Sequence, residues 1–132
     1  MNINYSIDRI PDVDQVIELY NNAGLPRPTG DRDRIHTMYL NSNFIVSGWD
    51  GDLLVGVARS LTDYNWSCYL ADLAVRKEYQ ILGIGNKLIE LTKEKMGPTC
   101  MILLLSVPGA MEYYPKVGFE KMNSAFWMKR ER

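Results

Sequence analysis

The sequence predicts a single α+β domain over residues 1–132, with a mixed, mostly antiparallel central sheet and helices on both of its faces. The first observation is size: 132 residues, 46% of them hydrophobic, are enough for one core and too few for two. The second is that stretches with helical apolar spacing alternate with short strand-like stretches. The third is that no repeat, low-complexity tract or linker divides the chain.

The N-terminal half is predicted to hold a strand, two helices and a three-stranded antiparallel meander. The first helix should stop at Gly24, and Thr29 or Asp31 can cap the second. Asp50 and Gly51 separate two strand-like runs, which is a strong hairpin signal. In order, the expected elements are a strand at 3–9, helices at 13–24 and 31–40, and strands at 44–49, 53–61 and 66–75.

The C-terminal half should add a parallel strand. Gly97 and Pro98 end the helix expected at 84–96. Because this helix joins the strands at 66–75 and 100–107, those two strands must run parallel. A short helix at 109–117 and strands at 119–122 and 125–129 complete the predicted order, β-α-α-β-β-β-α-β-α-β-β.

Composition excludes several classes of function. Fifteen basic and 16 acidic residues give a net charge of −1, so nothing favours nucleic acid or an anionic membrane as a general partner. The N-terminus has no signal-peptide pattern and the longest apolar run is too short to span a bilayer, so we expect a cytoplasmic protein. Two cysteines, Cys68 and Cys100, and one histidine, His36, predict no metal site.

Two glycines at the start of the helix at 84–96 predict an anion site. A helix start presents unpaired N–H groups and the positive end of the helix dipole, and Gly83 and Gly85 leave the approach unobstructed. Successive amides there can converge on a pyrophosphate. A dinucleotide fingerprint would need glycine in place of Leu88, and a P-loop would need Gly-Lys-Ser/Thr where Gly85 precedes Asn86 and Lys87.

Two motifs resemble those of a known family. The segment QILGIG, residues 80–85, matches the Q/R-x-x-G-x-G/A signature of the GCN5-related N-acetyltransferases (GNAT), and YYPKVGF, residues 113–119, is similar to their later F/Y-Y-x-K-x-G-F segment. The predicted order of elements agrees with the GNAT fold over essentially the whole chain. The resemblance implies that the protein transfers an acetyl group from acetyl coenzyme A to a primary amine of a small molecule or peptide, without a metal.

The same resemblance implies where acetyl-CoA binds. Its pantetheine arm is expected to enter where the strands at 66–75 and 100–107 diverge, and the amide of Leu73 is the candidate for polarising the thioester oxygen. The expected acetyl-CoA-binding residues are Leu73, Val75, Gln80, Ile81, Leu82, Gly83, Ile84, Gly85, Asn86 and Lys87.

Three further roles are expected around the reacting groups. Tyr114 is placed by the family pattern as the general acid that protonates the departing thiolate. Asp72 is the candidate general base, semi-buried with a raised pKa, although pairing with Arg59 is an equally open interpretation. The turn that holds Asp63, Tyr64 and Trp66 is expected to line the mouth of the acceptor site, where a carboxylate and aromatic rings favour a cation.

The sequence leaves some alternatives open. The main one is a non-catalytic sensor or regulatory module of the same fold that binds acyl-CoA without turnover. The acceptor amine and the use of acyl groups other than acetyl are not encoded in any recognisable pattern. Exposed sheet edges and the C-terminal AFWMKR make a homodimer a candidate assembly.

Overall fold

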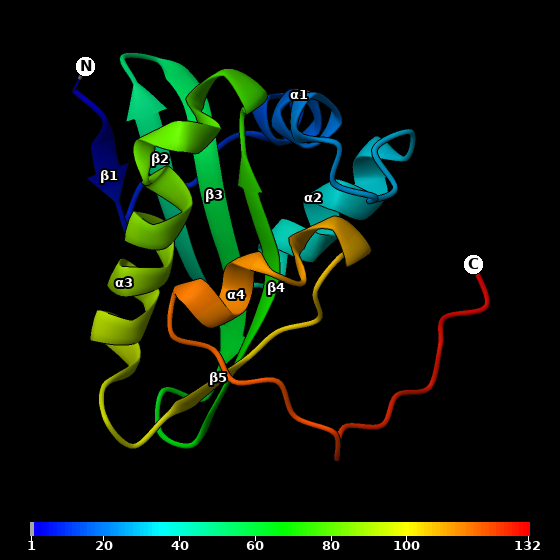
Figure 1. The fold of residues 1–132 in the computed structure, drawn as a ribbon. Helices are drawn as coiled ribbons and strands as arrows, with labels where there is room; N and C mark the ends of the chain where they lie inside the picture. Colours follow the sequence, from blue (N-terminus) through cyan, green and yellow to red (C-terminus); the bar gives the residue numbers. More distant parts are fainter. Residues whose placement is uncertain (1) are drawn as a thin grey trace.

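The computed structural model describes residues 2–132 as one five-stranded sheet with helices on both faces (Figure 1). The strands lie in chain order, β1-β2-β3-β4-β5; the first four are antiparallel neighbours and β5 is parallel to β4. The elements are β1 (Asn4–Ser6), α1 (Val13–Ala23), α2 (Arg32–Leu40), β2 (Phe44–Asp50), β3 (Leu53–Thr62), β4 (Ser67–Val75), the 3-10 helix η1 (Lys77–Leu82), α3 (Ile84–Met96), β5 (Met101–Leu103), the 3-10 helix η2 (Pro108–Ala110) and α4 (Tyr113–Lys116).

Two apolar clusters hold the layers together. Helices α1 and α2 cover one face, where Leu19 and Ile35 pack against Trp49 and Val57. Helices α3 and α4 cover the other face, where Leu88 packs with apolar residues from β2, β3 and β4 (Figure 1). A sheet that is apolar on both faces needs helices on both sides, and this arrangement confirms the α+β class predicted from the sequence.

The parallel pair β4–β5 is short, and this shapes the molecule. Pairing covers only Ser67–Tyr69 against Met101–Leu103. Beyond Tyr69, strand β4 continues along β3 to Val75, whereas the chain after Leu103 leaves the sheet. The backbone groups on that side of β4 therefore face a gap instead of a neighbouring strand.

A β-bulge bends β4 beside this gap. Arg59 of β3 lies opposite Asp72, but the next residue, Ser60, lies opposite Leu70, so Ala71 is the extra residue. A bulge adds local twist and redirects the residues that follow. The sequence pattern predicted the strand but not this bulge.

The predicted last two strands, at 119–122 and 125–129, are wrong: residues 119–132 form neither helix nor strand. The strand expected at 100–107 is present only as the shorter β5. In place of one helix at 109–117 the structure has two short ones, η2 and α4. The C-terminal chain runs away from the sheet instead of along β5 (Figure 1). Because a strand is defined by its pairing, an apolar alternating segment without a neighbour stays irregular. No helix within residues 2–132 is both long and apolar enough to cross a bilayer.

Candidate functional site

A cavity of about 130 Å³ opens where β4 and β5 diverge. Its walls come from the loop after α1, the second half of β4, the chain after β5, and α4. The lining residues that bear on the chemistry are Arg27, Leu73, Val75, Gln80, Leu104 and Tyr114. The structure therefore brings together residues that the sequence analysis placed at the strand gap and on the late helix.

Leu73 and Val75 direct their backbone polar groups into the cavity. The Arg76 N–H donates to the Val55 carbonyl across β3, at 2.8 Å. Because successive residues of an antiparallel strand point their N–H and C=O groups to opposite sides, those of Val75 and Leu73 point away from β3. The Val75 carbonyl accordingly accepts a hydrogen bond from the Gln80 side chain at 3.1 Å.

The N-terminus of α3 lacks the caps that the other long helices have. Helix α1 begins with a capping box between Asp12 and Gln15, and the Asp31 side chain caps α2. Helix α3 has no side-chain cap and no acidic residue in its first turn. Gly83, at φ +75, supplies the left-handed turn between η1 and α3, which a residue with a side chain rarely adopts. An uncapped helix start is suited to an anion from outside the chain.

The segment before α3 is exposed but anchored at its base. The Lys77 N–H donates to Asn22 Oδ1 at 2.9 Å, and Tyr79 donates its hydroxyl to Asp50 at 2.6 Å. Arg76 is buried, and its guanidinium donates hydrogen bonds to the Glu18 carboxylate and the Leu54 carbonyl. It therefore links α1 to β3 and is not available to an anion at the start of α3. The solvent-facing members of the predicted acetyl-CoA set are Gln80, Ile81, Leu82, Gly83, Asn86 and Lys87.

Gly85 has a close neighbour in the structure, whereas its backbone conformation is open to any residue. A Cβ atom at this position would lie 2.8 Å from the Tyr113 hydroxyl and 3.8 Å from Val75. Tyr113 thus packs from α4 onto the first turn of α3. The sequence motif placed a glycine here for an anion, and the structure adds a side chain of the same protein as a second reason.

Tyr114 lies in the cavity wall and packs edge-on against Tyr113 and Phe119, with ring centroids 5.3 and 5.6 Å apart. Burial raises the pKa of the Tyr114 hydroxyl above its ordinary value, and the nearby Tyr113 contributes in the same direction. The hydroxyl therefore keeps its proton at neutral pH, as a proton donor must.

Asp72 is not the semi-buried base with a raised pKa that the sequence suggested. The residue is 1% exposed, and its two carboxylate oxygens accept from Arg27 Nε at 2.6 Å, Arg59 Nε at 2.7 Å and the Tyr20 hydroxyl at 2.7 Å. Burial alone would raise the pKa of Asp72, but the hydrogen bond and charge of Arg59, with those of Arg27, outweigh it and lower the pKa. The alternative of an ion pair with Arg59 is confirmed.

Arg27 is a site residue that the sequence analysis missed. Its side chain, 23% exposed, lines the cavity, and Nη2 donates to the carbonyl of the bulged Ala71 at 3.0 Å. The available signal was a single arginine within the otherwise uncharged segment AGLPRPTG. Two guanidiniums around one carboxylate leave the cluster of Arg27, Arg59 and Asp72 with a formal charge of +1.

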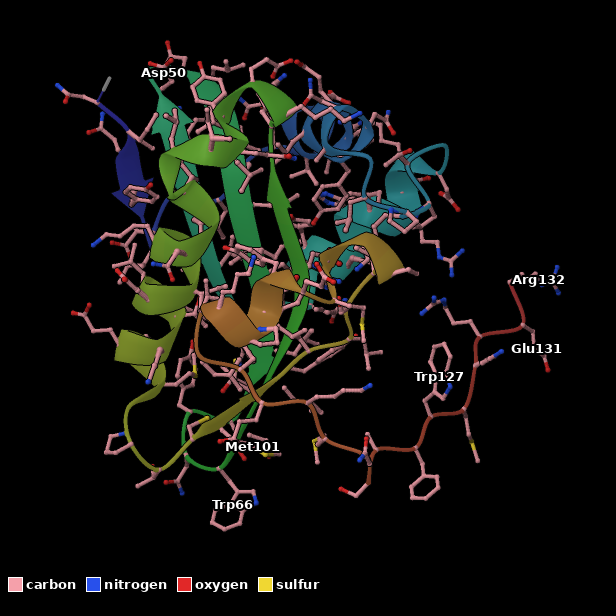
Figure 2. The ribbon with its side chains drawn as sticks, in the orientation of Figure 1. Asp50, Trp66, Met101, Trp127, Glu131 and Arg132 are labelled. Atoms are coloured by element: carbon pink, nitrogen blue, oxygen red, sulfur yellow. The ribbon has the colours of Figure 1, made fainter. Side chains whose placement is uncertain are left out.

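The turn at 63–66 does not reach the cavity, contrary to expectation. Asp63 accepts hydrogen bonds from the amides of Asn65, Trp66 and Ser67, which lower its pKa to about 2. The Tyr64 hydroxyl donates to the Asn43 carbonyl. Trp66 lies near Met101 at one end of the sheet, and Asp50, which anchors the segment before α3, lies at the other (Figure 2).

Within residues 2–132, no group of three or more histidine, cysteine or acidic side chains is arranged to hold a metal ion. Cys68 and Cys100 are both buried.

Residues 31–130 match the model of the acetyltransferase (GNAT) domain, so the chain belongs to the GNAT acetyltransferase family. This confirms the resemblance drawn from residues 80–85 and 113–119, and it places the chain in a family of acyltransferases. A curated relative, the uncharacterized N-acetyltransferase ycf52 of Pyropia yezoensis, is 28% identical over 83 residues, which cover 58% of this chain. The match spans about half of that relative, 48% of its length.

Solved structures share the fold. The SA2161 protein of meticillin-resistant Staphylococcus aureus superposes with a TM-score of 0.84 and 24% identity, covering 98% of this chain and 100% of that one. The aminoglycoside N-acetyltransferase AAC(6′)-Iy, solved in complex with CoA, gives a TM-score of 0.74 at 10% identity, covering 99% and 96% of the two chains. At these identities the likeness is one of fold.

The Asp72→Asn variant is expected to lose about 3 to 5 kcal/mol of unfolding free energy, because the buried Arg59 and the partly buried Arg27 would both lose their counter-charge. The lowered pKa also makes wild-type stability fall with acid: the contribution is complete above the unfolded pKa near 4 and is lost as pH drops through the folded value. Urea unfolding between pH 2 and 7 measures both effects. An equally steep acid branch in the variant would contradict this role.

Gly85→Ala is expected to destabilise the protein, because the new methyl group meets the Tyr113 hydroxyl. The double variant Gly85→Ala/Tyr113→Phe removes that hydroxyl and leaves the ring carbon Cζ at 3.6 Å, an ordinary contact. The midpoint temperature of thermal unfolding should therefore be higher in the double variant than in Gly85→Ala. Additive losses would mean that Tyr113 does not set the requirement for glycine.

Proposed function

We propose that this protein transfers an acetyl group from acetyl-CoA directly to a primary amine of a small molecule or peptide. One observation carries the proposal: the uncapped start of α3 adjoins a gap in the sheet whose wall holds a half-buried tyrosine, Tyr114. Membership of the GNAT family supplies the reaction class, acyl transfer. The backbone N–H and C=O groups that face this gap support acetyl-CoA as the acyl donor.

Acetyl-CoA binding is supported by backbone groups more than by charge. The diphosphate is proposed to bind the N–H groups between Ile81 and Asn86, with Lys87 as a nearby exposed cation. The pantetheine arm is proposed to lie along Leu73 and Val75, where it gains the partners that β5 does not provide. A protein with a net charge of −1 can hold a polyanion in this way.

The proposed reaction is a direct displacement. The amine nitrogen forms a bond to the acetyl carbon, the carbon–sulfur bond breaks, and the Leu73 N–H stabilises the negative charge on the carbonyl oxygen. The departing sulfur takes a proton from Tyr114, whose raised pKa keeps that proton available. Asp72 is fully engaged, so the amine is proposed to lose its proton to solvent.

The charge of the cavity bears on the acceptor. No acidic side chain lines it, and the Arg27 cluster carries a formal charge of +1. An ammonium group would find no counter-ion there, so the amine is proposed to enter in its neutral form. A carbonyl or carboxylate near the amine would face Arg27, which suits amino acids and peptides better than polyamines.

An amine panel tests the proposal. Incubation with acetyl-CoA should release free thiol with at least one amine, and amino-acid or peptide amines should react faster than polyamines. The rate should increase from pH 7 to 9, as more of the amine loses its proton. Thermal stabilisation by acetyl-CoA without thiol release from any amine would instead support a non-catalytic acyl-CoA sensor.

Tyr114→Phe tests the acid. We expect kcat to fall by about 10- to 1000-fold with little change in the KM for acetyl-CoA, because the ring is kept and only the proton is lost. Tyr5→Phe, on β1 at the opposite edge of the sheet, is the matched control. An unchanged kcat in Tyr114→Phe would reduce Tyr114 to a packing residue.

A further inference from the structure

The cavity between β4 and β5 differs in chemistry along its length. At one end the Gln80 side chain donates to the Val75 carbonyl, next to the proposed diphosphate site. At the other end Arg27, from the loop after α1, donates to the Ala71 carbonyl, two residues before Leu73. Of the described residues that line the cavity, only Arg27 carries a charge. An acceptor that reaches the Leu73 amide from this end therefore meets one guanidinium and otherwise uncharged walls.

The guanidinium of Arg27 has N–H groups to spare. A guanidinium carries five hydrogens, one on Nε and two on each Nη. Nε donates to Asp72 Oδ1 at 2.6 Å, Nη1 to the Pro26 carbonyl at 2.7 Å and Nη2 to the Ala71 carbonyl at 3.0 Å. Within residues 2–132 the side chain makes no further hydrogen bond, so one hydrogen remains on each Nη. Two donors on neighbouring nitrogens match the two oxygens of a carboxylate.

The charge around Arg27 favours a carboxylate over a neutral group. Arg27 and Arg59 share the single carboxylate of Asp72, which leaves a formal charge of +1. A bound carboxylate would neutralise this cluster, whereas a peptide carbonyl would leave the charge uncompensated and an ammonium group would add to it. Arg27 is also held by Asp72 and Ala71 before any ligand arrives, so little side-chain freedom is lost on binding.

We propose that the acceptor is a free α-amino acid, whose carboxylate binds the two remaining Nη hydrogens of Arg27 while its neutral amine attacks the thioester. This inference rests on the proposed function and narrows its acceptor from primary amines to amino acids. The nitrogen forms a bond to the acetyl carbon, the carbon–sulfur bond breaks, the sulfur takes a proton from Tyr114 and the amine loses one to solvent. The products are an N-acetyl amino acid and CoA.

The spacing along β4 suits an α-amino acid. Ala71, which Arg27 contacts, and Leu73, whose amide is proposed to stabilise the carbonyl oxygen, lie about 7 Å apart along an extended strand. A single carbon separates the amine and the carboxylate of an α-amino acid, so this ligand and its hydrogen bonds fill the interval without overshooting it.

The walls near Arg27 bear on the side chain of the amino acid. Gly24 and Leu25 in the loop and Leu70 and Ala71 on β4 are small or apolar lining residues. The cavity, of about 130 Å³, must also receive the acetyl group. Small or apolar amino acids such as glycine, alanine and leucine are therefore the expected acceptors.

Three matched series of acceptors test the carboxylate. Glycine, alanine and leucine are each compared with the amide of the same amino acid and with its decarboxylated amine, which are methylamine, ethylamine and 3-methylbutylamine. The value of kcat/KM comes from thiol release and is expressed per concentration of unprotonated amine. In the most reactive series the amino acid should exceed both relatives by about 10- to 100-fold.

The other outcomes separate this inference from the proposed function. An amide that reacts as well as its amino acid would assign the site to peptide N-termini, and an equally reactive decarboxylated amine would assign it to simple amines. Either result would overturn the inference and leave acetyl transfer standing. Thiol release from other amines but from none of these amino acids would do the same.

Arg27→Lys tests the residue itself. Lysine keeps a positive charge beside Asp72 but lacks the planar pair of donors. The kcat/KM for the amino acid should fall by about 10- to 100-fold, with little change for the decarboxylated amine or in the KM for acetyl-CoA. Arg32→Lys is the matched control, because Arg32 pairs with Asp14 on the exposed surface of α2 and does not line the cavity. Equal losses with all acceptors in Arg27→Lys would reduce Arg27 to a structural role and overturn the inference.

Binding of the product gives a readout without turnover. In the presence of CoA, calorimetry should show that N-acetylalanine binds the wild-type protein more tightly than N-ethylacetamide, which lacks the carboxylate. Arg27→Lys should abolish this difference. Equal binding of the two compounds to the wild type would overturn the inference even if the protein acetylates amines. Tighter binding of N-acetylalanine without thiol release from any amine would instead support the carboxylate site and overturn the proposed transfer.

Discussion

The arrangement of the cavity between β4 and β5 depends on the buried carboxylate of Asp72. It joins the loop after α1, through Arg27, to β3, through Arg59, and to α1, through Tyr20. Arg27 also holds the carbonyl of the bulged Ala71. These contacts fix the part of β4 that precedes Leu73, so the direction of the Leu73 amide depends on the ion pairs of the neighbouring Asp72.

The proposed acetyl-CoA site consists mainly of backbone N–H and C=O groups that the fold leaves unpaired. β5 stops pairing after three residues, η1 ends in a left-handed glycine, and α3 begins without a cap. Each feature leaves backbone donors or acceptors without an internal partner, at a cost that a bound substrate would offset. The modest net charge of the chain is consistent with recognition of this kind.

The sequence predicted the parts of this structure that local rules control. Gly83, Gly97 and Pro98 gave the limits of α3, and the chain order gave the parallel direction of β5. The Asp72 network was only half foreseen: the pairing with Arg59 was an open alternative, but the ion pair with Arg27, in the loop after α1, depends on tertiary packing and leaves no periodic signal. The last two strands failed for a related reason: AFWMKR has the composition of a strand, but composition does not say where its pairing partner lies.

The contact between Gly85 and the Tyr113 hydroxyl has an evolutionary consequence. These positions lie in different motifs, far apart in the chain, yet the space available at one is set by the residue at the other. A methyl group at position 85 would require the Tyr113 ring to shift or to lose its hydroxyl. Among its relatives, the residues at positions 85 and 113 should therefore vary together. Glycine at position 85 then reflects the packing of Tyr113 as well as the binding of a ligand.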